Sequence, residues 1–431
     1  MPDVGDFSTL NICMGSRTGS ADLPLHGGRV PAWLASRMAR LGRVLVEAIA
    51  LHYGRDEVLR RLSHPFWFQS LGAVMGMDWH SSGITTSVLG ALRRGLAPVE
   101  WELGIHVCGG RGKQSRKTPA ELVAVGERTG LDGDALARAS RLVAKVDSAA
   151  VQDGFELYLH GFVVTDDGRW TVVQQGMNPA SRKARRYHWL SEGISSFVDE
   201  PHAAILGEPG GAIVNLADRR AAPARDAELE LVARGPDFVV RELAAMTRAR
   251  LPATPARPAT LLLPHLCLPA HHEVTANDVV LRRLHGALAA AADRGPRDFV
   301  DLLLVPGLGA RTVLALAQVA EVVHGAPHRF SDPARFSLAH GGKDGHPFPV
   351  PLRVYDETLR VMRDAVDRAK LGQDDRLSAL ATLDREARRL EATASGPSFD
   401  DFVDDERRKS SSLGGMTVQG RARPPSRTRA S

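Results

Sequence analysis

The clearest local structure in this 431-residue chain is predicted by residues 155–175, which read Phe155-Glu-Leu-Tyr-Leu-His-Gly-Phe-Val-Val-Thr165, then Asp-Asp-Gly168, then Arg169-Trp-Thr-Val-Val-Gln-Gln175. Both runs are rich in β-branched and aromatic residues, which favour strands. Asp-Asp-Gly between two such runs is typical of a tight hairpin turn, because glycine reaches positive φ without steric cost. The stretch therefore predicts a prominent β-hairpin, and the surrounding chain is expected to build a mixed domain on it.

Helical patterns lie on both sides of this hairpin. Apolar residues recur at three- and four-residue steps, and several segments begin with residues that cap helices, such as Thr118 before Pro119. Helices are expected from Pro31, over 84–95, 118–129 and 132–145, for about 25 residues from Asp226, and over 277–292. Shorter strands are expected over 101–108 and 213–216.

The fold class predicted from these patterns is α+β. A mixed N-terminal domain with the β-hairpin is expected to be followed by an all-α domain, since 431 residues are too many for one ordinary core. The change of composition at a Pro/Ala/Thr-rich stretch gives the main boundary. The predicted organisation is a disordered extension (1–16), the α+β domain (17–250), a linker (251–260), the helical domain (261–395) and a disordered tail (396–431).

Composition limits the class of protein further. Hydrophobic residues make up 43% and charged residues 24%, as in globular proteins. The formal charge of +5 permits a nucleic-acid partner without requiring one. The three cysteines, Cys13, Cys108 and Cys267, are too far apart for a CxxC site, which fits a reducing cytoplasm. No run of about 18 apolar residues occurs, so no membrane partner is expected.

A second stretch, Leu302-Leu-Leu-Val-Pro-Gly-Leu-Gly-Ala-Arg-Thr312, indicates a binding function. Gly307 and Gly309 allow a tight turn, and a helix restarts at Ala310. The N-terminus of that helix directs unpaired N–H groups and the positive end of its dipole towards the turn. With Arg311 beside it, this arrangement suits an anion, and a nucleic-acid phosphate is the natural one.

Residues 297–321 resemble the helix-hairpin-helix motif, which grips nucleic-acid backbone without reading sequence. The resemblance implies that Gly307, Gly309, Arg311 and Thr312 contact nucleic acid, DNA more readily than RNA. Lys343, in the later loop Ala339-His-Gly-Gly-Lys-Asp-Gly345, is assigned to the same surface. The alternative interpretation of the turn is an ordinary corner between two helices.

Candidate catalytic residues are the ligand-type side chains in non-periodic segments around the hairpin: Asp78, His80, Lys145, Asp147, Asp153, His160 and His188. Carboxylates and imidazoles suit a divalent metal such as Mg²⁺ or Mn²⁺, which could activate water for phosphodiester hydrolysis. Lys145 could stabilise the developing charge. No standard motif such as His-Glu-x-x-His supports this assignment. In the alternative, the aspartates are caps or turn residues and the histidines are hydrogen-bonded core groups.

Two further polar segments have open interpretations. Gly109-Gly-Arg-Gly-Lys-Gln-Ser-Arg-Lys117 is either a solvated connection or a phosphate contact, and it lacks the ending of a P-loop. Gln174, Gln175 and Asn178 could read base edges, bind a small ligand, or satisfy one another on the hairpin.

Several long strings together resemble a widespread microbial family defined only as a domain of unknown function. They are Ala21-Asp-Leu-Pro-Leu-His-Gly-Gly28, Phe66-Trp-Phe-Gln69, Asp78-Trp-His-Ser-Ser-Gly83, Lys145-Val-Asp-Ser-Ala-Ala-Val-Gln-Asp-Gly154, Val172-Val-Gln-Gln-Gly-Met-Asn178, Ala184-Arg-Arg-Tyr-His-Trp189 and Ala339-His-Gly-Gly-Lys-Asp-Gly345. The resemblance implies membership and no mechanism.

The function expected from the sequence is therefore an uncharacterised nucleic-acid-binding protein that could act as a metal-dependent nuclease on DNA or RNA. The alternative is a non-catalytic nucleic-acid-binding module with a base- or nucleotide-binding pocket. The sequence leaves the metal, if any, and the oligomeric state open.

Overall fold

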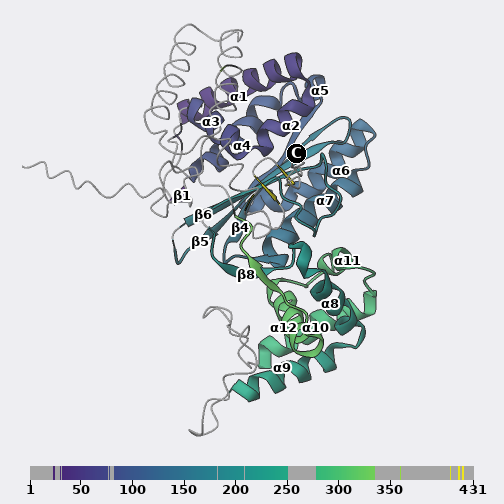
Figure 1. Ribbon diagram of the computed structural model, residues 1–431. Helices are drawn as coiled ribbons and strands as arrows, with labels where there is room; N and C mark the ends of the chain where they lie inside the picture. Colours follow the sequence, from purple (N-terminus) through teal and green to yellow (C-terminus); the bar gives the residue numbers. More distant parts are fainter. Residues whose placement is uncertain are drawn as a thin grey trace, which may run out of the picture.

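The computed structural model describes residues 23–24, 30, 32–75, 77, 82–181, 183–207, 209–250, 278–334, 360, 408, 416–417 and 420–421. These residues form an α+β fold with antiparallel sheets, which confirms the predicted fold class (Figure 1). The candidate residues Asp78, His80 and Lys343 lie outside the described residues, as do 1–16 and 251–260. Within the predicted tail, the short strands Met416–Thr417 (β10) and Gly420–Arg421 (β11) pair with each other.

The predicted hairpin forms the middle of the main sheet, which confirms its assignment. β4 and β5 pair antiparallel with Val164 opposite Trp170. The strand order is β1-β6-β5-β4-β2, with β7 paired to β6. The strands are β1 (Leu23–Pro24), β2 (Ile105–Arg111), β4 (Glu156–Thr165), β5 (Trp170–Asn178), β6 (Lys183–Leu190) and β7 (Ala204–Leu206).

One face of this sheet packs against the N-terminal helices, which Figure 1 shows along the upper side of the sheet. They are α1 (Ala32–Tyr53), α2 (Arg55–Ser63), α3 (Pro65–Val74), α4 (Gly83–Leu96) and α5 (Glu100–Leu103). Val163 and Val173 of the sheet belong to the same buried cluster as Phe68 and Leu92 of the helices. We call this the helical face of the sheet.

The expected strand over 101–108 is corrected by α5. Residues 101–103 are helical, and the strand begins at Ile105. The boundary is Gly104, whose φ of 65° is the left-handed conformation that ends helices. The expected loop at 109–117 is likewise replaced by the end of β2 and a 3₁₀ helix, Gly112–Lys117.

The opposite face of the sheet packs against α6 (Thr118–Thr129) and α7 (Gly133–Lys145), both as predicted. The carboxylate of Asp132 accepts the amide of Ala135 at 2.9 Å and so caps α7. At its other end α7 continues into one turn of π-helix, Val146–Ala150. Such turns often occur where a side chain must be redirected, and this one carries Asp147.

The C-terminal helices group at one end of the molecule (Figure 1). They are α8 (Ala222–Ala233), α9 (Pro236–Arg250), α10 (Asp278–Arg294), α11 (Phe299–Leu303) and α12 (Ala310–His324). The single helix expected from Asp226 is corrected to two, because Gly235 adopts φ 90° and precedes Pro236. No described helix is long and apolar enough to cross a membrane.

The part predicted as all-α also supplies a strand. β9 (Arg329–Ser331) pairs with β8 (Ala212–Asn215), which pairs with β3 (Val151–Gln152). Three residues are too few to show a strand period in the sequence, so the all-α expectation for 261–395 is corrected at this point. Trp189 of the main sheet and Val313 of α12 belong to one buried hydrophobic cluster. The division into two domains stays a prediction.

Replacing Glu228 by glutamine is expected to stabilise the protein at neutral pH. Glu228 of α8 is fully buried, and neither carboxylate oxygen has a hydrogen-bond partner among the described residues. Burial raises the pKa of this carboxyl well above its usual value. Ionisation therefore opposes folding as pH rises above about 4.3, the unfolded value.

We expect Glu228→Gln to raise the free energy of unfolding by about 1–3 kcal/mol at pH 7.5. The difference should shrink to roughly 0.5 kcal/mol near pH 4.5, where the wild-type carboxyl is protonated in the folded state and only about half ionised in the unfolded state. Urea unfolding at the two pH values measures it. A gain that is equal at both pH values would show that the charge of Glu228 is not its origin.

Candidate functional site

The segment predicted as the nucleic-acid contact consists of α11, a turn and α12. Asp298 caps α11 by accepting the amide of Asp301 at 2.7 Å. In the turn, Gly307 has φ 84°, a conformation that requires glycine. α12 then starts at Ala310 with no side-chain cap and no acidic residue in its first turn. Pro306, Gly307 and Arg311 are exposed, so this uncapped helix end faces solvent.

Gly309 is not explained by the fold. Its φ and ψ of −132° and −178° are extended values that any residue adopts. A Cβ added to it would meet no atom within 4 Å. Serine, threonine or aspartate would cap the helix at this position at least as well as glycine. A glycine that neither conformation nor packing requires is typical of a place where a ligand approaches the backbone closely.

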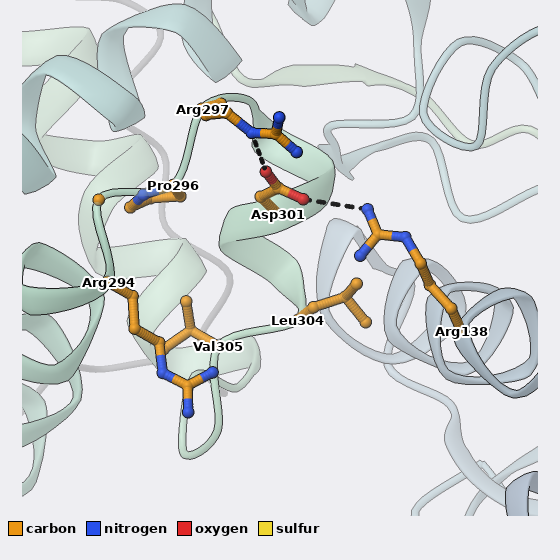
Figure 2. A pocket seen from close by; sticks show the side chains of 8 residues that line it. Arg138, Arg294, Pro296, Arg297, Asp301, Leu304 and Val305 are labelled. Carbon is orange, nitrogen blue, oxygen red and sulfur yellow. Dashed lines mark hydrogen bonds and ion pairs between the residues drawn. The ribbon is translucent and has the colours of Figure 1, made fainter. Parts of the chain in front are cut away.

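An open pocket of about 450 Å³ lies next to this turn. Figure 2 shows Arg138 of α7 facing the segment 294–305 across it. Asp301 accepts from Arg138 Nη2 at 3.0 Å and from Arg297 Nε at 3.2 Å. Arg294 also lines the pocket, so the lining carries three guanidinium groups and one carboxylate. We call Arg138, Arg294 and Arg297 the arginine pocket; its surplus charge suits an anion.

The turn is held in place by the string that begins at Lys145. Lys145 Nζ donates to the carbonyl of Leu308, and Gln152 Nε2 donates to the carbonyl of Ala310 at 2.9 Å. Lys145 is half-buried, which lowers the pKa of its ammonium group. The structure therefore places Lys145 as a support of the turn, and two stretches that the sequence suggested as separate sites are in contact.

Asp147 is the centre of a buried hydrogen-bond network. Its Oδ2 accepts from Gln174 Nε2 at 2.5 Å and from Trp189 Nε1 at 3.0 Å. Its Oδ1 lies 2.5 Å from His202 Nε2. The carboxylate is fully buried, and three donors that come from three separate segments surround it.

His160 extends this network through Gln174. His160 Nδ1 lies 2.6 Å from Gln174 Oε1, so Nδ1 carries the proton and donates. His160 Nε2 is then an acceptor, and the hydroxyl of Ser140 donates to it at 2.9 Å. Burial lowers the pKa of His160, which favours this neutral form. The sequence called attention to Asp147 and His160, but it gave no signal for Ser140 or His202.

Asp153 belongs to a second buried cluster. Its Oδ2 accepts from Arg185 Nη1 at 2.9 Å and from the hydroxyl of Tyr187 at 2.7 Å. The same Arg185 Nη1 lies 2.9 Å from Asp332 Oδ2, in the segment after β9. Asp332 also accepts the amide of Gly210 at 2.7 Å. Arg185 thus holds two carboxylates and joins β6 to the C-terminal part of the chain.

His188 lies on the helical face, away from Asp147 and Asp153. Its Nδ1 donates to the carbonyl of Leu62 in α2 at 3.2 Å. Burial and the positive charge of Arg186 lower the pKa of His188 well below its usual value. The described candidates therefore occupy four separate places, and only Asp147 and His160 share a network. Among the residues that the structure describes, no group of three or more His, Cys, Asp or Glu side chains could hold a metal ion.

Fold and site together define a mixed α+β protein in which a glycine turn and an arginine pocket lie next to each other at the surface. The chain belongs to a family described as protein of unknown function (DUF763), whose model matches residues 19–350. This match confirms the family resemblance inferred from the sequence strings. No curated protein and no solved structure matches the chain.

Proposed function

We propose that this protein binds nucleic acid through the phosphate backbone, with the arginine pocket and the Gly307–Gly309 turn as the contact surface. The observation that carries the proposal is the pocket, whose lining holds three arginines and one carboxylate next to the turn that leads to an uncapped helix end. Guanidinium groups bind phosphate with two parallel hydrogen bonds, and helix N-termini bind it through backbone amides. The arrangement of α11, turn and α12 supports the helix-hairpin-helix assignment.

The surface suits backbone contact better than base reading. Its polar groups are arginines and backbone amides, which contact phosphates and carry no sequence information themselves. DNA is the first ligand to test and RNA the second. The carboxylates Asp147 and Asp153 already accept hydrogen bonds from protein donors, so the proposal concerns binding rather than metal-dependent cleavage.

Neutralising the pocket is expected to weaken binding in a salt-dependent way. We compare wild type with the double variant Arg294→Gln/Arg297→Gln in fluorescence anisotropy titrations of labelled duplex DNA, single-stranded DNA and RNA. The plot of log K against log salt has a negative slope, and each lost phosphate contact should make it less steep by about 0.9 for duplex DNA. The double variant should therefore reduce the steepness by about 1.8. Affinity should drop roughly 10- to 100-fold at low salt.

The matched control is Arg60→Gln/Arg169→Gln, which removes the same charge from two exposed ion pairs distant in the sequence. If the control weakens binding as much as the pocket variant, the effect is one of net charge and the pocket assignment fails.

Gly309→Asp tests the helix end separately. A helix cap at this position should leave stability unchanged or raise it by about 0.3–1 kcal/mol, while its negative charge repels phosphate. Unchanged affinity in Gly309→Asp would exclude the helix end from the contact surface.

A further inference from the structure

Arg186 is buried on the helical face of the sheet, and no acidic side chain among the described residues pairs with it. Its side chain is fully buried, and Nε donates to Thr85 Oγ1 at 2.7 Å. Nη2 donates to the amide oxygen of Gln69 at 2.9 Å, and the guanidinium lies 4.9 Å from the centre of the Phe68 ring. All three neighbours are uncharged. Nη1 has no hydrogen-bond partner among the described residues.

A buried charge of this kind calls for a counter-charge. Taking a guanidinium out of water costs several kcal/mol unless an opposite charge compensates it, and neutral hydrogen bonds do so only in part. Burial lowers the pKa of Arg186 to about 9, so the group stays cationic at neutral pH. A water molecule could satisfy Nη1 but would not balance its charge. The missing component at this position is therefore an anion.

An unpaired acceptor lies beside this unpaired donor. Gln175 is directly opposite Arg186 in the pairing of β5 and β6, so the two side chains stand side by side on the helical face. Gln175 Nε2 donates to the carbonyl of Ser82 at 3.1 Å, and a carbonyl only accepts, so the amide orientation is fixed. Its Oε1 is buried and, within the described part of the chain, without a hydrogen-bond partner. An anion that carries a proton would satisfy this oxygen as well as balance the charge of Arg186.

Two residues link the cluster to the surface. Tyr158 lies half-buried, its hydroxyl forms side-chain hydrogen bonds with Thr86 and Gln175, and it interacts electrostatically with Arg111 and Arg186. Arg111 is exposed, with its guanidinium 5.8 Å from the centre of the Tyr158 ring. It begins the basic segment 111–117, one of the stretches for which the sequence suggested a phosphate contact.

We propose that Arg186 and Gln175 bind a phosphate group, either as inorganic phosphate or as the terminal phosphate of a nucleotide. Arg186 Nη1 donates to a phosphate oxygen, and a protonated phosphate oxygen donates to Gln175 Oε1. Phosphate monoesters have a second pKa near 6, so a protonated form is accessible near neutral pH. Sulfate has the same tetrahedral shape but is an unprotonated dianion in this range. The site should therefore prefer phosphate to sulfate.

The test is thermal unfolding of the full chain in phosphate-free buffer at pH 6.5, with phosphate or sulfate added at constant ionic strength. We expect the Tm to rise with the logarithm of the phosphate concentration, as binding to the native state requires. Sulfate should act at least about tenfold more weakly, because it leaves Gln175 Oε1 unpaired. Equal shifts with both anions would reflect general salt stabilisation and overturn the proposal.

The decisive variant is Gln69→Glu, which puts a carboxylate oxygen where an amide oxygen already accepts from Arg186. We expect this internal counter-charge to raise the Tm in phosphate-free buffer and to abolish the response to phosphate. A retained phosphate response would overturn the proposal. Arg60→Gln/Arg169→Gln, which removes the same number of positive charges from two exposed ion pairs, is the matched control and should keep the response; its loss there would show a general charge effect and overturn the proposal.

Two further measurements distinguish a nucleotide from inorganic phosphate and test whether the chain itself supplies the counter-charge of Arg186. A nucleoside 5′-monophosphate that shifts the Tm more than inorganic phosphate does, while the parent nucleoside has no effect, would assign the site to a nucleotide. Asp78 is the carboxylate closest in sequence to Ser82, so Asp78→Asn tests whether the chain supplies its own counter-charge. A large Tm loss in Asp78→Asn together with no phosphate response in wild type would overturn the proposal.

Discussion

Arg185→Met is expected to destabilise the protein by about 3–5 kcal/mol, since it leaves two carboxylates buried without their shared counter-charge. Arg185 Nη1 lies 2.9 Å from both Asp153 Oδ2 and Asp332 Oδ2. The two aspartates come from segments 179 residues apart, and both side chains are almost fully buried. Methionine fills much of the volume of arginine, so the loss would measure charge rather than a cavity.

The stability lost in Arg185→Met should increase as pH rises. Burial already raises the pKa of Asp153, and losing the positive charge of Arg185 raises it further above the unfolded value of about 3.9. Stability in the variant is therefore lost as pH rises, and the deficit is largest at neutral pH and narrows as pH falls towards 4. Urea unfolding at pH 7 and pH 4.5 checks this.

Two controls separate this mechanism from general damage. The triple variant Arg185→Met/Asp153→Asn/Asp332→Asn should recover part of the stability, because it removes the uncompensated charges together. Arg60→Met breaks an exposed ion pair with Glu192 and should change stability by less than about 1 kcal/mol. If the triple variant is less stable than Arg185→Met, the buried charges are not the cause.

The second large effect is expected at Asp147. Asp147→Ala removes an acceptor of Gln174, Trp189 and His202 and should cost about 3–5 kcal/mol, since three buried donors lose this carboxylate. Asp147→Asn should cost less, about 1–2 kcal/mol. Its amide oxygen can still accept from Gln174 and Trp189, and His202 can shift its ring proton to Nδ1 and accept from the new amide.

These variants also test the catalytic interpretation of Asp147. A metal ligand or general base would lose phosphodiester cleavage in Asp147→Asn with little change in stability, whereas a network centre loses stability. Cleavage assays with Mg²⁺ or Mn²⁺ on wild type and Asp147→Asn, beside urea unfolding, distinguish the two. Metal-dependent cleavage that disappears in a stably folded Asp147→Asn would contradict the structural interpretation.

Local patterns predicted the secondary structure well. The hairpin followed from two β-rich runs around Asp-Asp-Gly, and α6 and α7 followed from Thr118-Pro119 and Asp132. The errors arose where one residue changes the backbone, as at Gly104, or where an element is very short, as at β9. The first error depends on the left-handed φ of one glycine, and the second depends on pairing with β8, a strand distant in the sequence. A periodic pattern of apolar residues reports neither.

The candidate sites were predicted less completely. The sequence singled out Asp147, Asp153, His160 and His188 by residue type, and it placed Gln174 and Gln175 as base readers or mutual partners. In the structure Gln174 belongs to the Asp147 network and Gln175 to the opposite face. Neighbours in a strand point to opposite faces, so two adjacent glutamines cannot serve one buried cluster. Asn178 accepts the amides of Ala180 and Ser181 and shapes a turn.

By itself the sequence determined the elements, the family strings and the exposed glycine turn, because these depend on short-range backbone preferences. Only the tertiary structure decided which polar groups meet. Asp147 contacts His202, which lies 55 residues further along the chain. Asp153 and Asp332 both pair with Arg185, and Arg138 faces the turn from a helix distant in the sequence. Residue type shows that a polar group needs a partner when it is buried, but the partner is selected by how helices and sheet pack. The same packing leaves Arg186 without an acidic neighbour among the described residues.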